Sequence, residues 1–326
     1  MNAPADRRVW VALATYNGAR YIGEQIASIR QQSFSDWTLL VRDDMSRDGT
    51  LALIESAAAL DPRIRILRDG RGKLGAIGNF GALMAEALKE GADYLFFSDQ
   101  DDVWHPEKIA IMLGAMRELE ASSPGRPLLV HSDLAVVDGS LAEISPSFMD
   151  YSKLSPDRAV PGVLLCQNQV TGCATVINRS LLEQACPVPR EVLMHDWWLA
   201  LLAAAAGKIA YVPMPLVSYR QHEGNVLGAV SFWRRIAQLL TSRVHWERFA
   251  EVVRGSVVQA RLLAERLRER RVEVSSDTTE SIDVYATILK APRLGRVARL
   301  RRHGIGKPQR TKGWMFNLMI TLLERS

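Results

Sequence analysis

Residues 94–106 contain the densest group of side chains that could do chemistry. The run begins with the apolar sequence Tyr-Leu-Phe-Phe and ends with three carboxylates, Asp99, Asp101 and Asp102. An apolar run with aromatic residues predicts a buried strand, and the proline that closes it predicts the first turn of a helix. Three neighbouring acids repel one another unless a cation neutralises them or one of them holds a proton. The cluster therefore indicates either a divalent-ion site with oxygen ligands or a solvated turn with Asp as the helix cap.

Polar side chains also follow the other strands that the pattern predicts in this half of the chain. Apolar runs at residues 9–14, 37–41 and 64–67 alternate with helical spacing, which predicts a doubly wound parallel sheet. Because right-handed crossovers bring the carboxyl ends of parallel strands to one edge, we expect the polar segments to meet there. These segments are Thr15-Tyr16-Asn17, Asp43-Asp44, Gly75 to Asn79, and Asp99 to Asp102.

Two common nucleotide-binding patterns are absent from the predicted edge. The glycine-rich segment 70–78 lacks the Gly-Lys-Ser/Thr of a P-loop, and no Gly-x-Gly-x-x-Gly follows the first strand. The sequence therefore argues against a P-loop ATPase and against a dinucleotide-dependent dehydrogenase.

Length and composition indicate a globular protein in a reducing compartment. The 326 residues suffice for one large domain and a smaller one, and 48% hydrophobic with 24% charged residues are ordinary values. The three cysteines have no metal-ligand spacing, and their odd number gives no disulfide framework. We recognise no signal peptide and no run long enough to span a bilayer, so we expect a cytoplasmic protein.

The pattern becomes mixed after residue 125. Strands are expected at 128–134, at 169–177 with a Gly-containing bend, and at 209–212, with a long loop at 145–161 and an apolar helix that begins near Trp197. We therefore predict a domain at 1–228 that consists of two halves, 1–125 and 126–228. Trp104, Trp197 and Trp198 could stack on a ligand, although at least one of the adjacent pair is expected in the core.

Residues 229–326 are expected to form a helical, basic extension. Residues 231–326 hold 20 basic and 9 acidic side chains, whereas residues 1–230 hold 21 and 27. Apolar and aromatic residues recur at helical spacing between the arginines, which suits a helix on an anionic membrane surface. A helical appendage packed on the core, or a contact in a homodimer, is the alternative. No nucleic-acid-binding fold accompanies the charge, so no nucleic-acid partner is expected.

Six short motifs occur over residues 8–228 in the order found in the inverting family 2 glycosyltransferases, and the chain resembles that family. Within it, the chain is similar to the bacterial rhamnosyltransferases, which build O-antigen and other surface polysaccharides from dTDP-L-rhamnose. The resemblance implies an α/β fold of the GT-A nucleotide-diphospho-sugar transferase type, with a Rossmann-like mixed sheet. It also implies that residues 1–125 form a nucleotide-binding half, that residues 126–228 form an acceptor-binding half, and that the ligand of the tryptophans is a sugar. The motifs are Ala14-Thr-Tyr-Asn-Gly18, Val41-Arg-Asp-Asp-Met-Ser-Arg-Asp-Gly-Thr50, Gly75-Ala-Ile-Gly-Asn79, Ser98-Asp-Gln-Asp-Asp102, His195-Asp196 and Tyr219-Arg-Gln-His222.

The resemblance implies a place for a dTDP-sugar or UDP-sugar donor. A carboxylate at the end of the second strand can accept the N3–H of thymine or uracil, a donor that cytosine lacks. The segment after the first strand would line the base and ribose. The residues implied to contact the donor are Thr15, Tyr16, Asn17, Asp43, Asp44, Gly75, Asn79, Asp99 and Arg220.

The resemblance also implies a Mn²⁺ or Mg²⁺ ion beside the donor diphosphate. Asp101 would bind the ion, Asp99 would lie near the ribose and the ion, and His222 would reach the metal or the diphosphate. Asp102 could bind the ion directly, or it could lie next to the residues that bind it. Such an ion stabilises negative charge that develops on a leaving diphosphate.

Asp196 matches the carboxylate that acts as the catalytic base in this family. Inversion requires that an acceptor hydroxyl lose its proton while it attacks the anomeric carbon. The family often has Glu before this Asp, whereas this chain has His195, which leaves open which of the two is the base; we favour Asp196, with His195 contacting the acceptor. The alternative is that Asp196 only caps the following helix.

The sequence thus predicts an inverting glycosyltransferase, with L-rhamnose from dTDP-β-L-rhamnose as the favoured donor sugar. The expected acceptor is a lipid-linked or growing surface glycan, handled by a protein at the inner face of the cell membrane. The alternatives are a metal-dependent sugar nucleotidyltransferase and a non-catalytic sugar-binding subunit of a biosynthetic complex. The acceptor linkage and the oligomeric state stay open.

Overall fold

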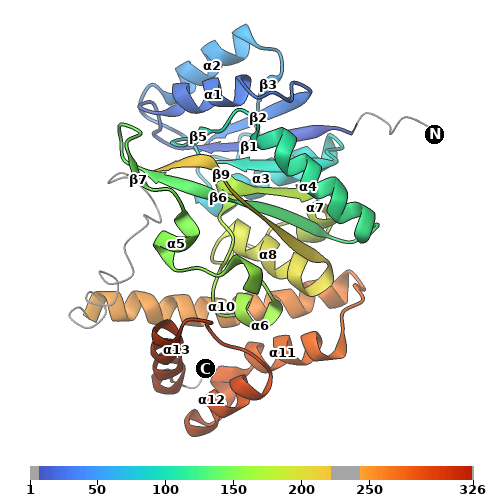
Figure 1. The fold of residues 1–326 in the computed structure, drawn as a ribbon, viewed down its shortest axis with the longest axis vertical. Coiled ribbons are helices and arrows are strands. Elements are labelled where there is room, and N and C mark those ends of the chain that lie inside the picture. The colour runs from blue at the N-terminus through green and yellow to red at the C-terminus, as the bar shows by residue number, and fades with distance from the viewer. Residues whose placement is uncertain (1–6, 222–242, 325–326) are drawn as a thin grey trace. The chain divides into compact units, whose positions relative to one another are not determined.

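The computed structural model describes residues 7–221 and 243–324 (Figure 1). The chain divides into two compact units. Residues 1–148, 171–188 and 209–228 form one, here called the sheet unit. Residues 149–170, 189–208 and 229–326 form the other, here called the helical unit. The predicted extension at 229–326 therefore shares a unit with two earlier segments, while the functional halves predicted within 1–228 stay a prediction.

The sheet unit is built on one mixed nine-stranded sheet in the order β3-β2-β1-β4-β8-β6-β9-β5, with β7 paired to β6. β1, β2, β3 and β4 pair in parallel, whereas β8 is antiparallel to both β4 and β6. The purely parallel sheet expected from the first half is thus only half of a mixed sheet. The strands are β1 (Val9–Thr15), β2 (Trp37–Asp43), β3 (Ile64–Ile66), β4 (Tyr94–Ser98), β5 (Val103–Trp104), β6 (Leu128–Val137), β7 (Glu143–Ser145), β8 (Thr175–Asn178) and β9 (Lys208–Arg220).

Helices cover the sheet because its central strands are apolar on both sides. All five residues of β4 are buried, and adjacent side chains point to opposite faces. Phe96 packs against Trp104, while Phe97 meets Phe80 of α3 edge-on at 5.9 Å. The helices of this unit are α1 (Ile22–Arg30), α2 (Thr50–Leu60), α3 (Gly75–Lys89), α4 (Lys108–Ser122) and α7 (Arg179–Ala185).

Two segments of the second half differ in detail from the prediction. The strand with a Gly-containing bend expected at 169–177 has its bend as a 3-10 turn at Gly172–Ala174, and the strand itself begins at Thr175. The loop expected at 145–161 contains a short helix, α5 (Phe148–Ser152), and a 3-10 turn at Pro156–Arg158. Both segments contain short helical turns, and their sequences have no clear hydrophobic period that would predict such turns.

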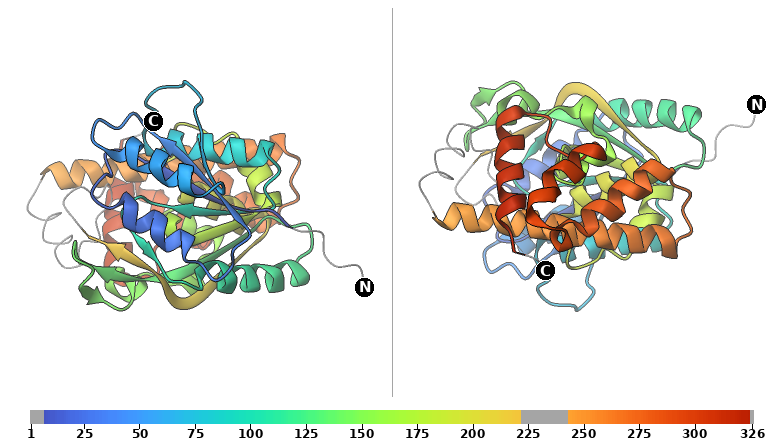
Figure 2. Two further views of the ribbon diagram at one scale, coloured as in Figure 1. Left: turned by 90° about the horizontal axis from the view of Figure 1, so that it is seen from above. Right: turned by 90° about the horizontal axis from the view of Figure 1, so that it is seen from below.

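The helical unit contains the remaining helices, which Figure 2 shows in orange to red for the C-terminal part. None of the described helices is long and apolar enough to cross a membrane. They are α6 (Pro161–Leu164), α8 (His195–Ala206), α10 (Arg243–Glu269), α11 (Ser276–Ala286), α12 (Arg293–Arg302) and α13 (Arg310–Leu322), with a 3-10 turn at Ile288–Lys290.

A buried arginine holds the C-terminal helices of this unit together. Arg296 of α12 is fully buried, and its guanidinium donates to four backbone carbonyls at 2.6–3.0 Å. Two of these carbonyls close α13, where the helix dipole favours a cation. The acceptors are the carbonyls of Leu289, Ala291, Ile320 and Leu323.

We expect Arg296→Met to lower the free energy of unfolding by about 3 kcal/mol, because it leaves several buried carbonyls without a donor. Urea unfolding followed by circular dichroism measures the change. Arg299→Met, an exposed change on the same helix, is the matched control and should shift stability by less than about 0.5 kcal/mol. Equal stability of the two variants would contradict the role assigned to Arg296.

Candidate active site

The three predicted acids lie at the carboxyl end of β4, as the sequence indicated. Asp99 and Asp101 are partly exposed, whereas Asp102 is fully buried. Gln25 of α1 donates to the Ser98 hydroxyl at 2.6 Å, and that hydroxyl donates to the Asp99 carbonyl at 3.1 Å. The end of β4 is therefore held in place by hydrogen bonds from α1 and from its own last residue.

Asp102 is the innermost acid of the cluster. Its Oδ1 accepts the backbone N–H of Arg220 at 3.2 Å, and the Cys173 sulfur lies within 4.8 Å of one of its carboxylate oxygens. Burial, together with the neighbouring Asp101 and Asp99, raises the pKa of Asp102 well above its usual range. The surroundings of Asp102 therefore disfavour its charged form.

The geometry of this cluster suits a cation. Ligand atoms of Asp99, Asp102 and Cys173 lie within 4.8 Å of one another. Two carboxylates match the oxygen preference of Mg²⁺ or Mn²⁺, and Cys173, which was expected to be a buried small side chain, is indeed buried. The structure therefore groups Asp102 with Asp99, whereas Asp101 is outside this group and His222 lies outside the described residues.

Arg220 connects the acid cluster to three other parts of the sheet unit. Its side chain donates to the Asp101 carbonyl at 2.8 Å, to the Gly139 carbonyl at 2.7 Å and to the Glu24 carboxylate at 2.6 Å. The guanidinium also lies over the Tyr21 ring, 4.5 Å from its centre. These contacts fix the position of the Asp101 backbone; the predicted contact of Arg220 with a diphosphate stays a prediction.

Lys108, which the sequence did not single out, lies in the interior near the same acids. Its ammonium group donates to the Cys173 carbonyl at 2.5 Å and lies 3.3 Å from the centre of the Trp104 ring. Complete burial lowers the pKa of Lys108 to about 7, although Asp102 and Asp99 oppose that shift. Trp104 is therefore a core residue in contact with a lysine, and its ring is 2% exposed. Only the position of Lys108 in the first turn of the helix after the acids could have suggested it.

Asp43 and Thr15 meet at the ends of β2 and β1. The Thr15 hydroxyl donates to Asp43 at 2.9 Å, and Ser46 donates to the same carboxylate from its hydroxyl at 2.5 Å and its N–H at 2.8 Å. Asn17 adopts a φ of 49° and accepts the Arg47 N–H at 2.9 Å through its side chain. Thr15 is buried while Asn17 is exposed, so one side of this turn packs against the protein and the other side faces solvent.

Asp44 has a different environment from Asp43. Its buried carboxylate accepts Arg42 at 2.9 Å and the backbone N–H groups of Leu74 and Gly75 at 2.7 and 2.8 Å. Asn79 donates to the Arg42 carbonyl at 3.1 Å and is also buried. Asp44, Gly75 and Asn79 therefore join β2 to the start of α3, and their predicted contacts with the donor stay untested.

Gln100 is a second residue that sequence reasoning missed. Its side chain accepts the Tyr16 N–H at 2.8 Å and donates to the Tyr16 carbonyl at 3.0 Å. A Cβ atom on Gly18 would lie 2.3 Å from the Gln100 Oε1, so a larger residue there would displace the Gln100 side chain. The Tyr16 ring, 41% exposed, has the Lys73 ammonium 3.8 Å from its centre. Gln100 thus connects the loop after β1 to the acid cluster.

The predicted catalytic pair belongs to the helical unit. His195 and Asp196 begin α8, and both are buried, with Asp196 9% exposed. Asp196 Oδ1 accepts the Trp197 N–H at 2.6 Å, so the carboxylate is a hydrogen-bond acceptor for a backbone N–H in the first turn of the helix. Burial lowers the pKa of His195 to about 3, which keeps its ring neutral near pH 7. Trp197 and Trp198 are both buried, so neither offers an open face to a sugar.

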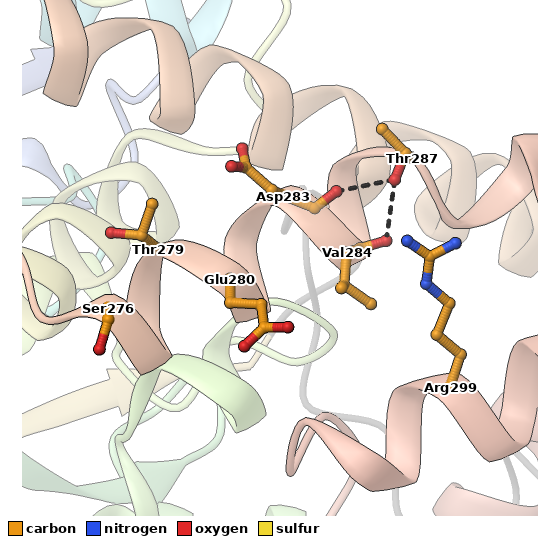
Figure 3. Close-up of a pocket in the computed structure, with 7 residues that line it drawn as sticks. All are labelled: Ser276, Thr279, Glu280, Asp283, Val284, Thr287 and Arg299. Carbon is orange, nitrogen blue, oxygen red and sulfur yellow. Dashed lines mark hydrogen bonds between the residues drawn. The ribbon is translucent and has the colours of Figure 1, made fainter.

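A groove of about 660 Å³ lies on α11 and α12 of the helical unit (Figure 3). None of the predicted site residues lines it. Its acids have basic neighbours, since Asp283 pairs with Arg268 at 2.8 Å and Glu280 lies 3.8 Å from His303. We assign this groove no part in donor binding.

Comparison with known proteins agrees with the arrangement of the sheet unit. The family model for glycosyl transferase family 2 matches residues 10–128. The dTDP-rhamnosyl transferase RfbG of Shigella flexneri is 28% identical over 242 residues, which cover 72% of this chain and 81% of that protein. The amylovoran biosynthesis glycosyltransferase AmsB of Erwinia amylovora is 24% identical over 236 residues, covering 68% of this chain and 75% of the relative.

Two solved structures share the fold. The S. aureus TarS fragment 1–349 in complex with UDP-GlcNAc has a TM-score of 0.53 at 16% identity, over 91% of this chain and 89% of the other. The mannosyltransferase PcManGT of Pyrobaculum calidifontis, in complex with GDP-Man and Mn²⁺, has a TM-score of 0.53 at 18% identity, over 98% and 86%. Residues 10–128 are therefore similar to the family 2 glycosyltransferases, and the chain shares the GT-A fold of these structures.

Proposed function

We propose that this glycosyltransferase moves L-rhamnose, with inversion, from dTDP-β-L-rhamnose to a growing bacterial polysaccharide or lipid-linked glycan. The observation that carries the proposal is the similarity to a dTDP-rhamnosyl transferase over 72% of the chain. Relatives in amylovoran and undecaprenol-linked glycan synthesis support the acceptor class. Inversion of a β-linked donor gives an α-linked product.

Asp43 is the proposed recognition group for the nucleotide base. A carboxylate offers about four acceptor positions, and Thr15 and Ser46 occupy three of those on Asp43. The remaining position on Oδ2 can accept the N3–H of thymine or uracil. Asp44 is less suited, because it is 2% exposed and holds the start of α3. This arrangement favours dTDP and UDP over CDP.

The acids after β4 are the proposed site for the diphosphate and its divalent ion. Asp99 and Asp101 are partly exposed, and Asp102 is buried behind them; a cation beside the three carboxyls would favour their charged forms. An ion held there supplies positive charge to the diphosphate of the donor. Arg220 holds the backbone of Asp101, Gln100 holds the loop after β1, and Asp43 orients the nucleotide.

Asp196 is the proposed base that takes the proton of the acceptor hydroxyl. It lies in the first turn of α8, where the helix dipole stabilises a carboxylate. His195 is neutral near pH 7, so it can orient an acceptor hydroxyl without adding charge beside that carboxylate.

Asp196→Ala should reduce transfer at least ~10²-fold, since loss of a general base typically costs 10²–10⁴-fold. Asp101→Ala should also reduce transfer at least ~10²-fold, because it removes one of the acids proposed to hold the ion that stabilises the leaving diphosphate. Release of dTDP from dTDP-β-L-rhamnose measures the rate. Asp196→Asn should still bind dTDP with near-normal affinity by calorimetry, because the base is not a donor-binding group. Asp277→Asn, an exposed first-turn acid of α11, is the matched control. Full activity of either alanine variant would overturn the role given to that residue.

We also propose that the helical unit brings the enzyme to an anionic membrane surface, where a lipid-linked acceptor is held. Residues 284–323 contain no acid, and α12 exposes Arg293, Arg299, Arg301 and Arg302. Leu294 on the same helix is 96% exposed, and Trp314 of α13 is 62% exposed. Arginines beside exposed apolar side chains suit the headgroup region of anionic lipid.

Reversal of two exposed charges, Arg301→Glu with Arg302→Glu, should weaken binding to vesicles that contain phosphatidylglycerol by ~30-fold or more, at about 1 kcal/mol for each arginine removed. Co-sedimentation at two salt concentrations measures it. The control pair, Arg117→Glu with Arg126→Glu, makes the same charge change on the sheet unit and should bind as the wild type does. Equal binding of the wild type to neutral phosphatidylcholine vesicles would contradict the proposal.

A further inference from the structure

The segment that leads into the His195–Asp196 pair is held by the long C-terminal helix α10. The backbone N–H of Leu193 donates to the side-chain Oε1 of Gln259 at 3.0 Å. Gln259 is fully buried and lies 66 residues further along the chain. A buried amide–carbonyl hydrogen bond of this kind fixes the position of the backbone that precedes α8.

The same face of α10 makes two further contacts with this region. Gly255, one helical turn before Gln259, faces Leu193, and a Cβ atom there would lie 2.5 Å from the Leu193 Cδ2. Arg266 lies over the ring of Trp198, 5.5 Å from its centre. Residues 255, 259 and 266 fall on one stripe of an α-helix, so α10 presents a single continuous surface to the start of α8.

The start of α8 needs such external support because it has no side-chain cap. Met194 occupies the N-cap position in an extended conformation and makes no side-chain capping hydrogen bond. The Trp197 indole donates to the Leu164 carbonyl of α6 at 2.6 Å, which fixes the first turn from its other side. Leu193 and Trp197 are thus both held, and Asp196 lies between them.

We infer that Gln259, with Gly255 beside it, is a positioning residue that sets the place of the Asp196 carboxylate at the start of α8. The inference rests on the proposed role of Asp196 as the base. It gives the C-terminal helices a part in the transfer reaction itself, in addition to the proposed membrane contact. A displacement of about 1 Å at a reacting group can cost ~10²-fold in rate, so a single hydrogen bond before Asp196 has a measurable effect.

The test compares Gln259→Leu, Gln259→Glu and Gly255→Ala with the wild type in the full-length enzyme. Gln259→Leu removes the acceptor of the Leu193 N–H, Gln259→Glu keeps one, and Gly255→Ala forces Leu193 to move. We expect Gln259→Leu and Gly255→Ala to lower kcat by about 10- to 100-fold, with the donor KM and the dTDP Kd unchanged within about 2-fold. Gln259→Glu should recover most of the lost kcat. Arg254→Ala, an exposed change on α10, is the control.

Each result decides the inference. Wild-type kcat in Gln259→Leu, with Asp196→Asn inactive, would overturn the positioning role and leave the base in place. Full activity of Asp196→Asn would overturn the base and the positioning role together. An equal loss of kcat, dTDP affinity and thermal stability in all three variants, without recovery in Gln259→Glu, would show that α10 only supports folding and would also overturn the inference.

Discussion

The concentration of negative charge after β4 is the constraint on which the arrangement of the sheet unit depends. Asp102 is buried beside Asp99 and Asp101, and burial of a carboxylate is costly unless other groups stabilise it. Two buried basic residues lie beside the acids: Arg220, whose backbone N–H donates to Asp102 and whose side chain donates to the Asp101 carbonyl, and Lys108, whose side chain donates to the Cys173 carbonyl. The pairing of β5 with β9, with Val103 opposite Ser218, brings Arg220 to this place. The strands β9 and β5 at one end of the sheet thus position Arg220 beside the acids that follow β4.

The two units carry different parts of the proposed reaction. Donor groups, from Asp43 to the acids after β4, all belong to the sheet unit, where short hydrogen bonds to backbone fix each loop. The proposed base belongs to the helical unit, where α6 and α10 fix both sides of Asp196. Segments 149–170 and 189–208 join the C-terminal helices in one unit, so residues beyond 243 contribute to the surroundings of the base.

Local patterns predicted the strand ends and their acids, because a buried strand followed by polar residues is a local signal. Asp99, Asp102, Thr15 and Asp43 therefore appear where the sequence placed them. The partners of these residues were not predictable, because they are distant in the chain: Gln100 bonds Tyr16 across 84 residues, and Arg220 bonds Asp101 across 119. Arg220 was assigned to the diphosphate from its motif alone, and the structure shows it in contact with the protein. The bend expected within 169–177 is present, but the strand begins later than predicted, because a 3-10 turn has no sequence period that marks its bounds.

The most direct test of the account is a crystal structure of the full chain with dTDP and Mn²⁺, with anomalous diffraction to locate the metal. The account predicts an anomalous peak beside Asp99 and its neighbouring carboxylates, in contact with the diphosphate, and the thymine N3–H donating to Asp43. A nucleotide bound away from the carboxyl ends of β1, β2 and β4, or a metal with no carboxylate of this cluster among its ligands, would contradict it.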